Sequence, residues 1–60
     1  MQTVAVEQGV WRLEQNSDTM MLTLFKYRNE VCSWKSDVLY DWQQLYDLLL
    51  TESYKRRNDE

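Results

Sequence analysis

Apolar residues change their spacing near Ser36 and Asp37. Before this point they alternate with polar residues at roughly every second position, and after it they recur every three or four. Alternation is typical of a strand with one buried face, whereas the longer spacing is typical of an amphipathic helix. The pattern therefore predicts an α+β fold, with a three-stranded antiparallel β-meander in residues 10–35 and one C-terminal amphipathic helix in residues 37–55 packed on the sheet.

Three segments have the composition of strands, and two polar clusters between them have the composition of turns. The strands are expected at Val10–Gln15, Thr19–Tyr27 and Val31–Lys35, and the turns at 16–18 and 28–30. Short polar side chains in these clusters can hydrogen-bond nearby backbone groups, and Asn29 tolerates left-handed backbone angles. Residues 1–9, which end at the only glycine, are read either as a short edge strand or as a flexible lead-in.

The helix is predicted to run from about Val38 to Tyr54. Ser36 or Asp37 is its expected N-cap, because either side chain can accept a hydrogen bond from the unpaired amides of the first turn. The basic residues 55–57 suit the negative end of the helix dipole. Residues 56–60 are expected to form a flexible polar tail.

Alternate strand residues point to opposite faces of a sheet, and one face collects most of the large apolar side chains. Its members are expected to be Trp11, Leu13, Met21, Phe25, Tyr27, Cys32 and Trp34. One helix stripe should pack upon this face, and it comprises Val38, Trp42, Leu45 and Leu49. Together the two sets predict a single hydrophobic core.

The 60 residues form one small domain, near the lower limit at which a hydrophobic core suffices alone. One cysteine and no histidine exclude an internal disulfide and a common zinc site, so Cys32 is expected to be an inert free thiol. The chain has neither a segment of membrane-spanning length nor a signal peptide, which favours a soluble cytoplasmic protein. Self-association is the natural remaining source of stability.

Catalytic chemistry has little support in this sequence. A glycine-rich phosphate loop and a histidine base are both missing. Asp37, Asp41 and Gln44 share a helix face, with Asp47 farther round, but dispersed acids on a helix are typical of a solvated face. The sequence therefore predicts a protein that is not an enzyme and that carries no cofactor and no metal.

A second apolar stripe on the helix exceeds what a small sheet can cover. It comprises Leu39, Tyr46, Leu50 and Tyr54. Either the N-terminal segment folds across it in a monomer, or a second molecule buries it, and tyrosines suit the rim of an interface. The leading hypothesis is a non-enzymatic protein-binding adaptor or regulator that forms a homodimer through its helix and binds an unidentified protein partner.

The charge distribution leaves two further hypotheses open. The net charge of −3 lies entirely in residues 37–60, and four bases are predicted on the outer sheet face beside Leu22 and Leu24. These bases are Arg12, Lys26, Arg28 and Lys35, which could contact phosphates of a nucleic acid or be ordinary solvated side chains. A nucleic-acid-binding module is thus the alternative function, and a third is an acidic surface at Asp37, Asp41 and Asp47 that binds a basic protein.

Overall fold

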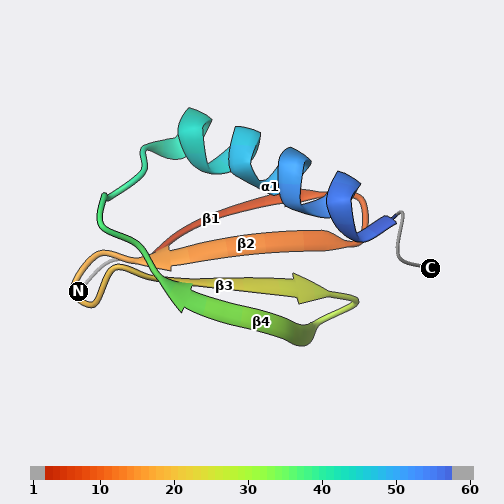
Figure 1. Cartoon of the computed structure of the whole chain (residues 1–60), viewed down its shortest axis with the longest axis horizontal. Coiled ribbons are helices and arrows are strands. Elements are labelled where there is room, and N and C mark those ends of the chain that lie inside the picture. Colours follow the sequence, from red (N-terminus) through yellow and green to blue (C-terminus); the bar gives the residue numbers. More distant parts are fainter. Residues whose placement is uncertain (1–2, 58–60) are drawn as a thin grey trace.

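One helix packs across one face of a four-stranded antiparallel sheet (Figure 1). The computed structural model describes residues 3–57 and contains, in chain order, β1 (Thr3–Gln8), β2 (Trp11–Asn16), β3 (Met21–Lys26), β4 (Asn29–Lys35) and α1 (Trp42–Arg57). Each strand pairs with the next along the chain, and α1 lies closest to β1 and β2. The predicted α+β fold, with an antiparallel sheet packed against one C-terminal helix, is confirmed.

The prediction of three strands is wrong, because Thr3–Gln8 forms a fourth. Gly9, at φ +61°, occupies the first position of a two-residue turn that joins Gln8 to Trp11. Left-handed angles at this position match the twist of a hairpin, and glycine adopts them without strain. Val6 is therefore buried opposite Leu13. Within residues 1–9 the edge-strand reading applies from Thr3 onward, and Met1 and Gln2 lie outside the described residues.

The β2–β3 connection sets which face of β3 is buried, and it corrects the predicted face. Asn16 Oδ1 accepts hydrogen bonds from the backbone amides of Asp18 and Thr19 at 2.7 and 3.1 Å, and the loop ends at Met20 with φ 63°. This loop places Leu24 opposite Leu13 on the helix side. Met21, Phe25 and Tyr27 are consequently not in the core, whereas Leu22 and Leu24 are fully buried.

The β3–β4 turn begins one residue earlier and ends two residues earlier than predicted. Tyr27 and Arg28 have φ values of 52° and 73°, so both residues of this two-residue turn adopt left-handed angles. Asn29 already belongs to β4. The ladder then shifts register at Leu24/Phe25, where Val31 is the extra residue of a bulge.

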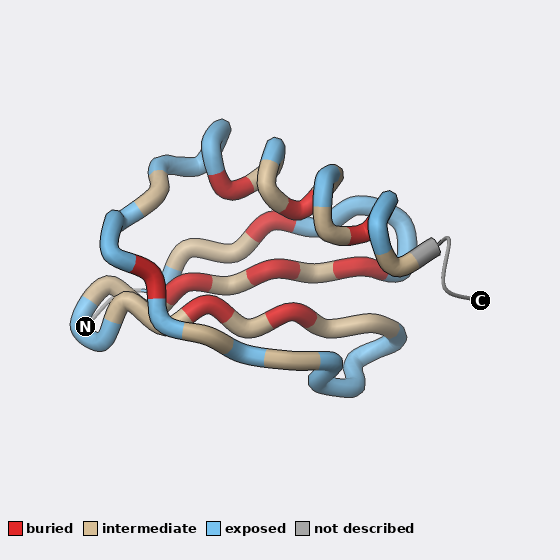
Figure 2. Tube along the Cα trace, in the orientation of Figure 1, coloured by how far each residue is buried: buried red, intermediate tan, exposed pale blue. Residues whose placement is uncertain are grey.

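The core lies between α1 and the inner face of the sheet, and buried positions alternate along β2 and β3 (Figure 2). Its fully or nearly fully buried apolar side chains are Val6, Trp11, Leu13, Leu22, Leu24, Leu45 and Leu49. Cys32 and Trp34 pack partly against this cluster, as expected. Two members of the predicted helix stripe do not: Val38 precedes the helix, and Trp42 in its first turn is exposed.

The helix begins later than predicted because Asp41 caps it. Asp41 Oδ1 accepts from the Gln44 amide at 2.8 Å, and Gln44 Oε1 accepts from the Asp41 amide at 3.1 Å. This reciprocal pair is a capping box. Ser36, one of the two predicted caps, instead holds the loop, since its Oγ accepts from the Val38 amide at 3.1 Å.

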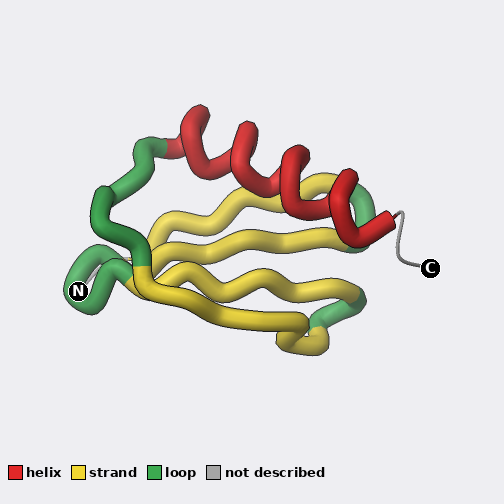
Figure 3. Tube along the Cα trace, in the orientation of Figure 1, coloured by secondary structure: helices red, strands yellow, loops and turns green. Residues whose placement is uncertain are grey.

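Gln15 explains why residues 36–41 form a loop instead of the first turn of the helix (green between β4 and α1 in Figure 3). Its side chain is 1% exposed and points from β2 into this loop. Gln15 Nε2 donates to the Val38 carbonyl at 2.9 Å, and Gln15 Oε1 accepts from the Tyr40 amide at 2.8 Å. The loop backbone therefore has hydrogen-bond partners in the sheet, which compete with helical ones.

Candidate protein interface on the helix

A row of large side chains runs along α1 and is only partly covered by the rest of the protein. We call it the helix stripe, and it comprises Trp42, Tyr46, Leu50 and Tyr54. Trp42 and Tyr54 at its two ends are each 66% exposed, while Tyr46 and Leu50 between them are half-buried. Leu39, the fourth predicted interface residue, is 53% exposed but lies in the preceding loop. The structure thus brings together three of the four predicted residues and adds Trp42.

Spacing of four residues fixes the direction of the helix stripe. Each step of four advances about 40° around a helix of 3.6 residues per turn, so the row drifts gradually away from the buried Leu45 and Leu49. The rings of Trp42 and Tyr46 stack at a centroid distance of 6.3 Å and an interplanar angle of 12°. The i, i+4 repeat at 42, 46, 50 and 54 was the sequence signal for including Trp42.

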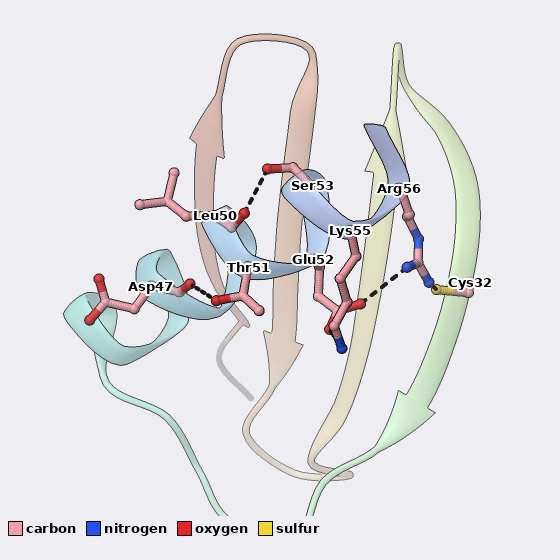
Figure 4. Close-up of polar contacts among 8 residues, drawn as sticks. All are labelled: Cys32, Asp47, Leu50, Thr51, Glu52, Ser53, Lys55 and Arg56. Atoms are coloured by element: carbon pink, nitrogen blue, oxygen red, sulfur yellow. Dashed lines mark hydrogen bonds and ion pairs between the residues drawn. The ribbon is translucent and has the colours of Figure 1, made fainter. Parts of the chain in front are cut away.

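On the opposite flank of α1, polar side chains near its C-terminal end connect the helix to β4 (Figure 4). Arg56 Nη1 binds Glu52 Oε1 at 3.2 Å, and Arg56 Nη2 donates to Cys32 Sγ at 3.0 Å. Lys55 Nζ lies 3.6 Å from Glu52 Oε2. In the same view Leu50 points to the β1 side of the helix, away from these groups. The helix stripe therefore faces the β1 edge of the sheet, while the ion pairs face β4.

The four bases predicted for nucleic-acid contact do not share one face. Arg12 lies on the outer face and binds Glu7 and Glu14 at 2.7 Å each. Lys26 lies opposite Trp11 on the inner side, with Nζ 5.0 Å from that ring centroid. Arg28 is in the β3–β4 turn, and Lys35 ends β4. The expected cluster of four is wrong, because β3 turns Lys26 to the inner face and Arg28 lies in the turn after it. The nucleic-acid hypothesis itself stays a prediction.

Two neighbouring carboxylates act on the charge of Arg12. Its hydrogen bond to Glu14 is the largest cause of the change in its pKa. Burial, the next largest, lowers the pKa, and the nearby charges of Glu14 and Glu7 raise it. Together they raise the pKa of the guanidinium above its ordinary value. Arg12 is therefore a fixed cation already neutralised by two carboxylates, which weakens its attraction for a phosphate.

The predicted acidic surface is likewise divided. Asp37 lies in the loop and Asp47 on the helix, while Asp41 uses one carboxylate oxygen to cap α1. Within residues 3–57 no three His, Cys, Asp or Glu side chains are grouped to hold a metal ion. In the same part of the chain, no helix is long and apolar enough to cross a membrane.

Comparisons with protein-family models, with curated proteins and with solved structures found no match to this chain. Function is therefore inferred from the arrangement of the side chains. The helix stripe is a continuous row of large side chains with an exposed aromatic ring at each end. Aromatic residues are enriched at protein interfaces.

Proposed function

We propose that this chain is a non-enzymatic protein-binding adaptor or regulator that acts as a homodimer through α1. The observation that carries the proposal is the exposure of Trp42 and Tyr54 at the two ends of the helix stripe. Large aromatic side chains left in water on a small domain mark an interaction surface, because their burial is strongly favourable. Tyr46 and Tyr54 add hydroxyl groups that can remain hydrated at the rim.

A second copy of the chain is the occupant that the helix stripe fits best. A two-fold axis brings the same row of two helices together, so a row of large side chains at constant spacing is complementary to itself. Rows spaced by four residues are also the ridges that most often interdigitate when helices pack. Antiparallel helices oppose their dipoles and place the acidic residue Asp41 toward the basic residues Lys55 and Arg56 in the last turns of the other copy.

The adaptor role rests on apolar surface that lies outside the helix stripe. Val38 and Leu39 are about half exposed in the loop before α1. Gln15 fixes this loop through the Val38 carbonyl and the Tyr40 amide, so the two side chains are presented on an ordered backbone. An ordered apolar loop beside the dimer interface offers a contact for a different protein.

Sedimentation of the purified full chain over a micromolar concentration series tests the homodimer. The variant Tyr54→Lys removes an exposed ring of the helix stripe, and Thr51→Lys is its matched control because Thr51 is exposed on the outward side of the same helix. We expect a dimer for the native chain and for Thr51→Lys. For Tyr54→Lys we expect the dissociation constant of the dimer to rise by roughly tenfold or more. A native chain that sediments as a monomer throughout would contradict the proposal.

A further inference from the structure

The two edges of the sheet differ in how they are protected against pairing. The β4 edge carries the bulge at Val31 and has Glu30 and Lys35 near its ends. Bulges and charges of this kind discourage addition of a further strand. The β1 edge has no bulge, since its pairing with β2 is regular over six residues, and its single charged side chain, Glu7, is paired with Arg12 at 2.7 Å. The β1 edge is therefore open to another strand.

Hairpin geometry indicates which backbone groups of β1 face this open edge. In a two-residue hairpin the residues that flank the turn, here Gln8 and Trp11, exchange hydrogen bonds. Because backbone direction alternates along an antiparallel strand, the amides and carbonyls of Thr3, Ala5 and Glu7 then point away from β2. The six groups of these three residues form a row of donors and acceptors at the spacing of a β-ladder.

We infer that β1 pairs antiparallel with β1 of a second copy, which joins the two sheets into one and sets the two α1 helices side by side on the same face. The inference deepens the proposed homodimer and rests on it. The helix stripe and the open edge lie on the same side of the molecule, since Leu50 points to the β1 side of α1 (Figure 4). One two-fold axis can therefore bury both.

The helix spacing agrees with this arrangement. Each α1 lies over β1 and β2, so in a continuous sheet the two helices are separated by two strand spacings. At about 4.8 Å per strand this gives about 9.6 Å, within the roughly 8–10 Å at which helices pack. A twist of about −20 to −25° per strand rotates the helices by about −40 to −50°, close to the roughly −50° of packing between four-residue ridges.

The area of the helix stripe gives a second reason for including β1. Two aromatic side chains of about 150–250 Å² each, 66% exposed, offer roughly 200–330 Å² per copy. Stable interfaces bury about 800 Å² per partner, so contact through the helices alone is small. Pairing of β1 adds the edge backbone and the side chains around it to the same interface.

The helix stripe is centred at position 48, so a two-fold axis there places Trp42 of one copy against Tyr54 of the other.

Amide hydrogen exchange of the full chain, followed by NMR, tests the pairing. We expect the Ala5 and Glu7 amides to exchange at least roughly tenfold more slowly in the dimer than in a diluted or Tyr54→Lys sample, because strand pairing protects them. A dimer whose Ala5 and Glu7 amides exchange as fast as in the monomer would overturn the strand pairing and leave the helix-mediated homodimer standing. A monomer at every concentration would overturn both.

A substitution at the open edge gives an independent readout. Ala5→Pro removes an outward amide and leaves the ladder with β2 intact, as proline is tolerated at sheet edges where its nitrogen faces away from the neighbouring strand. We expect dimer dissociation constants to rise roughly tenfold, with the helical circular dichroism retained. Ala5→Thr, which keeps the amide, serves as the control and should dimerise as the native chain does. Equal dimerisation of all three chains would contradict the strand pairing, and if Ala5→Pro does not fold, the exchange rates of the native chain decide.

Discussion

Gln15 is predicted to be the polar side chain on which the sheet–helix connection depends most. It is 1% exposed, and no other described residue links β2 to both Val38 and Tyr40. The variant Gln15→Met keeps nearly the same length and volume but removes the amide. Its effect therefore separates hydrogen bonding from packing, which a truncation to alanine would confuse by leaving a cavity.

The expected cost follows from the contacts. Two well-formed hydrogen bonds, at 2.9 and 2.8 Å, contribute about 1 kcal/mol each, and a third to the Met20 carbonyl at 3.4 Å adds little. Losing the partner of the Tyr40 amide brings the total to about 2–3 kcal/mol. A 60-residue chain is expected to have roughly 3–9 kcal/mol of stability, so the variant loses a large part of it.

Urea unfolding followed by tryptophan fluorescence measures this loss, at one fixed protein concentration because association would shift the curve. With an m-value near 1 kcal/mol/M, the midpoint should fall by about 2–3 M. Gln43→Met, at an exposed position in the first turn of α1, is the control and should change stability by less than about 0.5 kcal/mol. A Gln15→Met midpoint equal to that of the control would refute the view that this side chain holds the loop.

Two further substitutions probe the same connection. In Gln15→Glu, burial and the facing Val38 carbonyl should outweigh the Tyr40 amide and raise the pKa of the new carboxyl above about 4.3, because only its protonated form can donate to that carbonyl. The stability of this variant relative to the native chain should therefore be greatest at low pH, below the pKa of the carboxyl in the unfolded chain. It should fall as the pH rises through the pKa of the carboxyl in the folded chain. Urea midpoints that differ from the native ones by a constant amount between about pH 4 and 8 would contradict the expectation. Asp41→Ala removes one half of the capping box and should lower the free energy of unfolding by about 1 kcal/mol in the same assay. The control Asp37→Ala, in the exposed loop, should lower it by less than about 0.5 kcal/mol. Equal losses would mean that Asp41 is not the effective cap.

The pattern of hydrophobic positions predicted the parts of the fold that depend on periodicity alone. Leu45 and Leu49 face the sheet as the helical spacing requires, and Trp11 and Leu13 alternate into the core as strand residues should. Both features depend only on the spacing of apolar residues within a single helix or strand. The fourth strand was only one of two readings of residues 1–9, because a single turn residue, Gly9, marks its end and the chain before Gly9 is short.

The inward face of β3 could not be read from periodicity. Both alternations in this strand contain large apolar residues, with Leu22 and Leu24 in one and Met21 and Phe25 in the other. The loop after Asn16 decides between them, and adding or removing one residue there would exchange the two faces. The same choice carries Lys26 to the inner side, above Trp11, so an error of one residue in this loop also put Lys26 into the predicted cluster of bases.

The start of the helix shows how a distant residue overrides a local signal. Ser36 and Asp37 are suitable caps by composition, but a cap acts only where the following residues turn into a helix. Gln15, more than 20 residues earlier in the chain, binds the Val38 carbonyl and the Tyr40 amide and keeps them in a loop. The helix can then begin only after Tyr40, and the Asp41-x-x-Gln44 sequence supplies the next cap. Trp42 thereby enters the first turn at the end of the sheet and remains in water, so the hydrogen bonds of one buried glutamine determine which aromatic ring is available at the candidate interface.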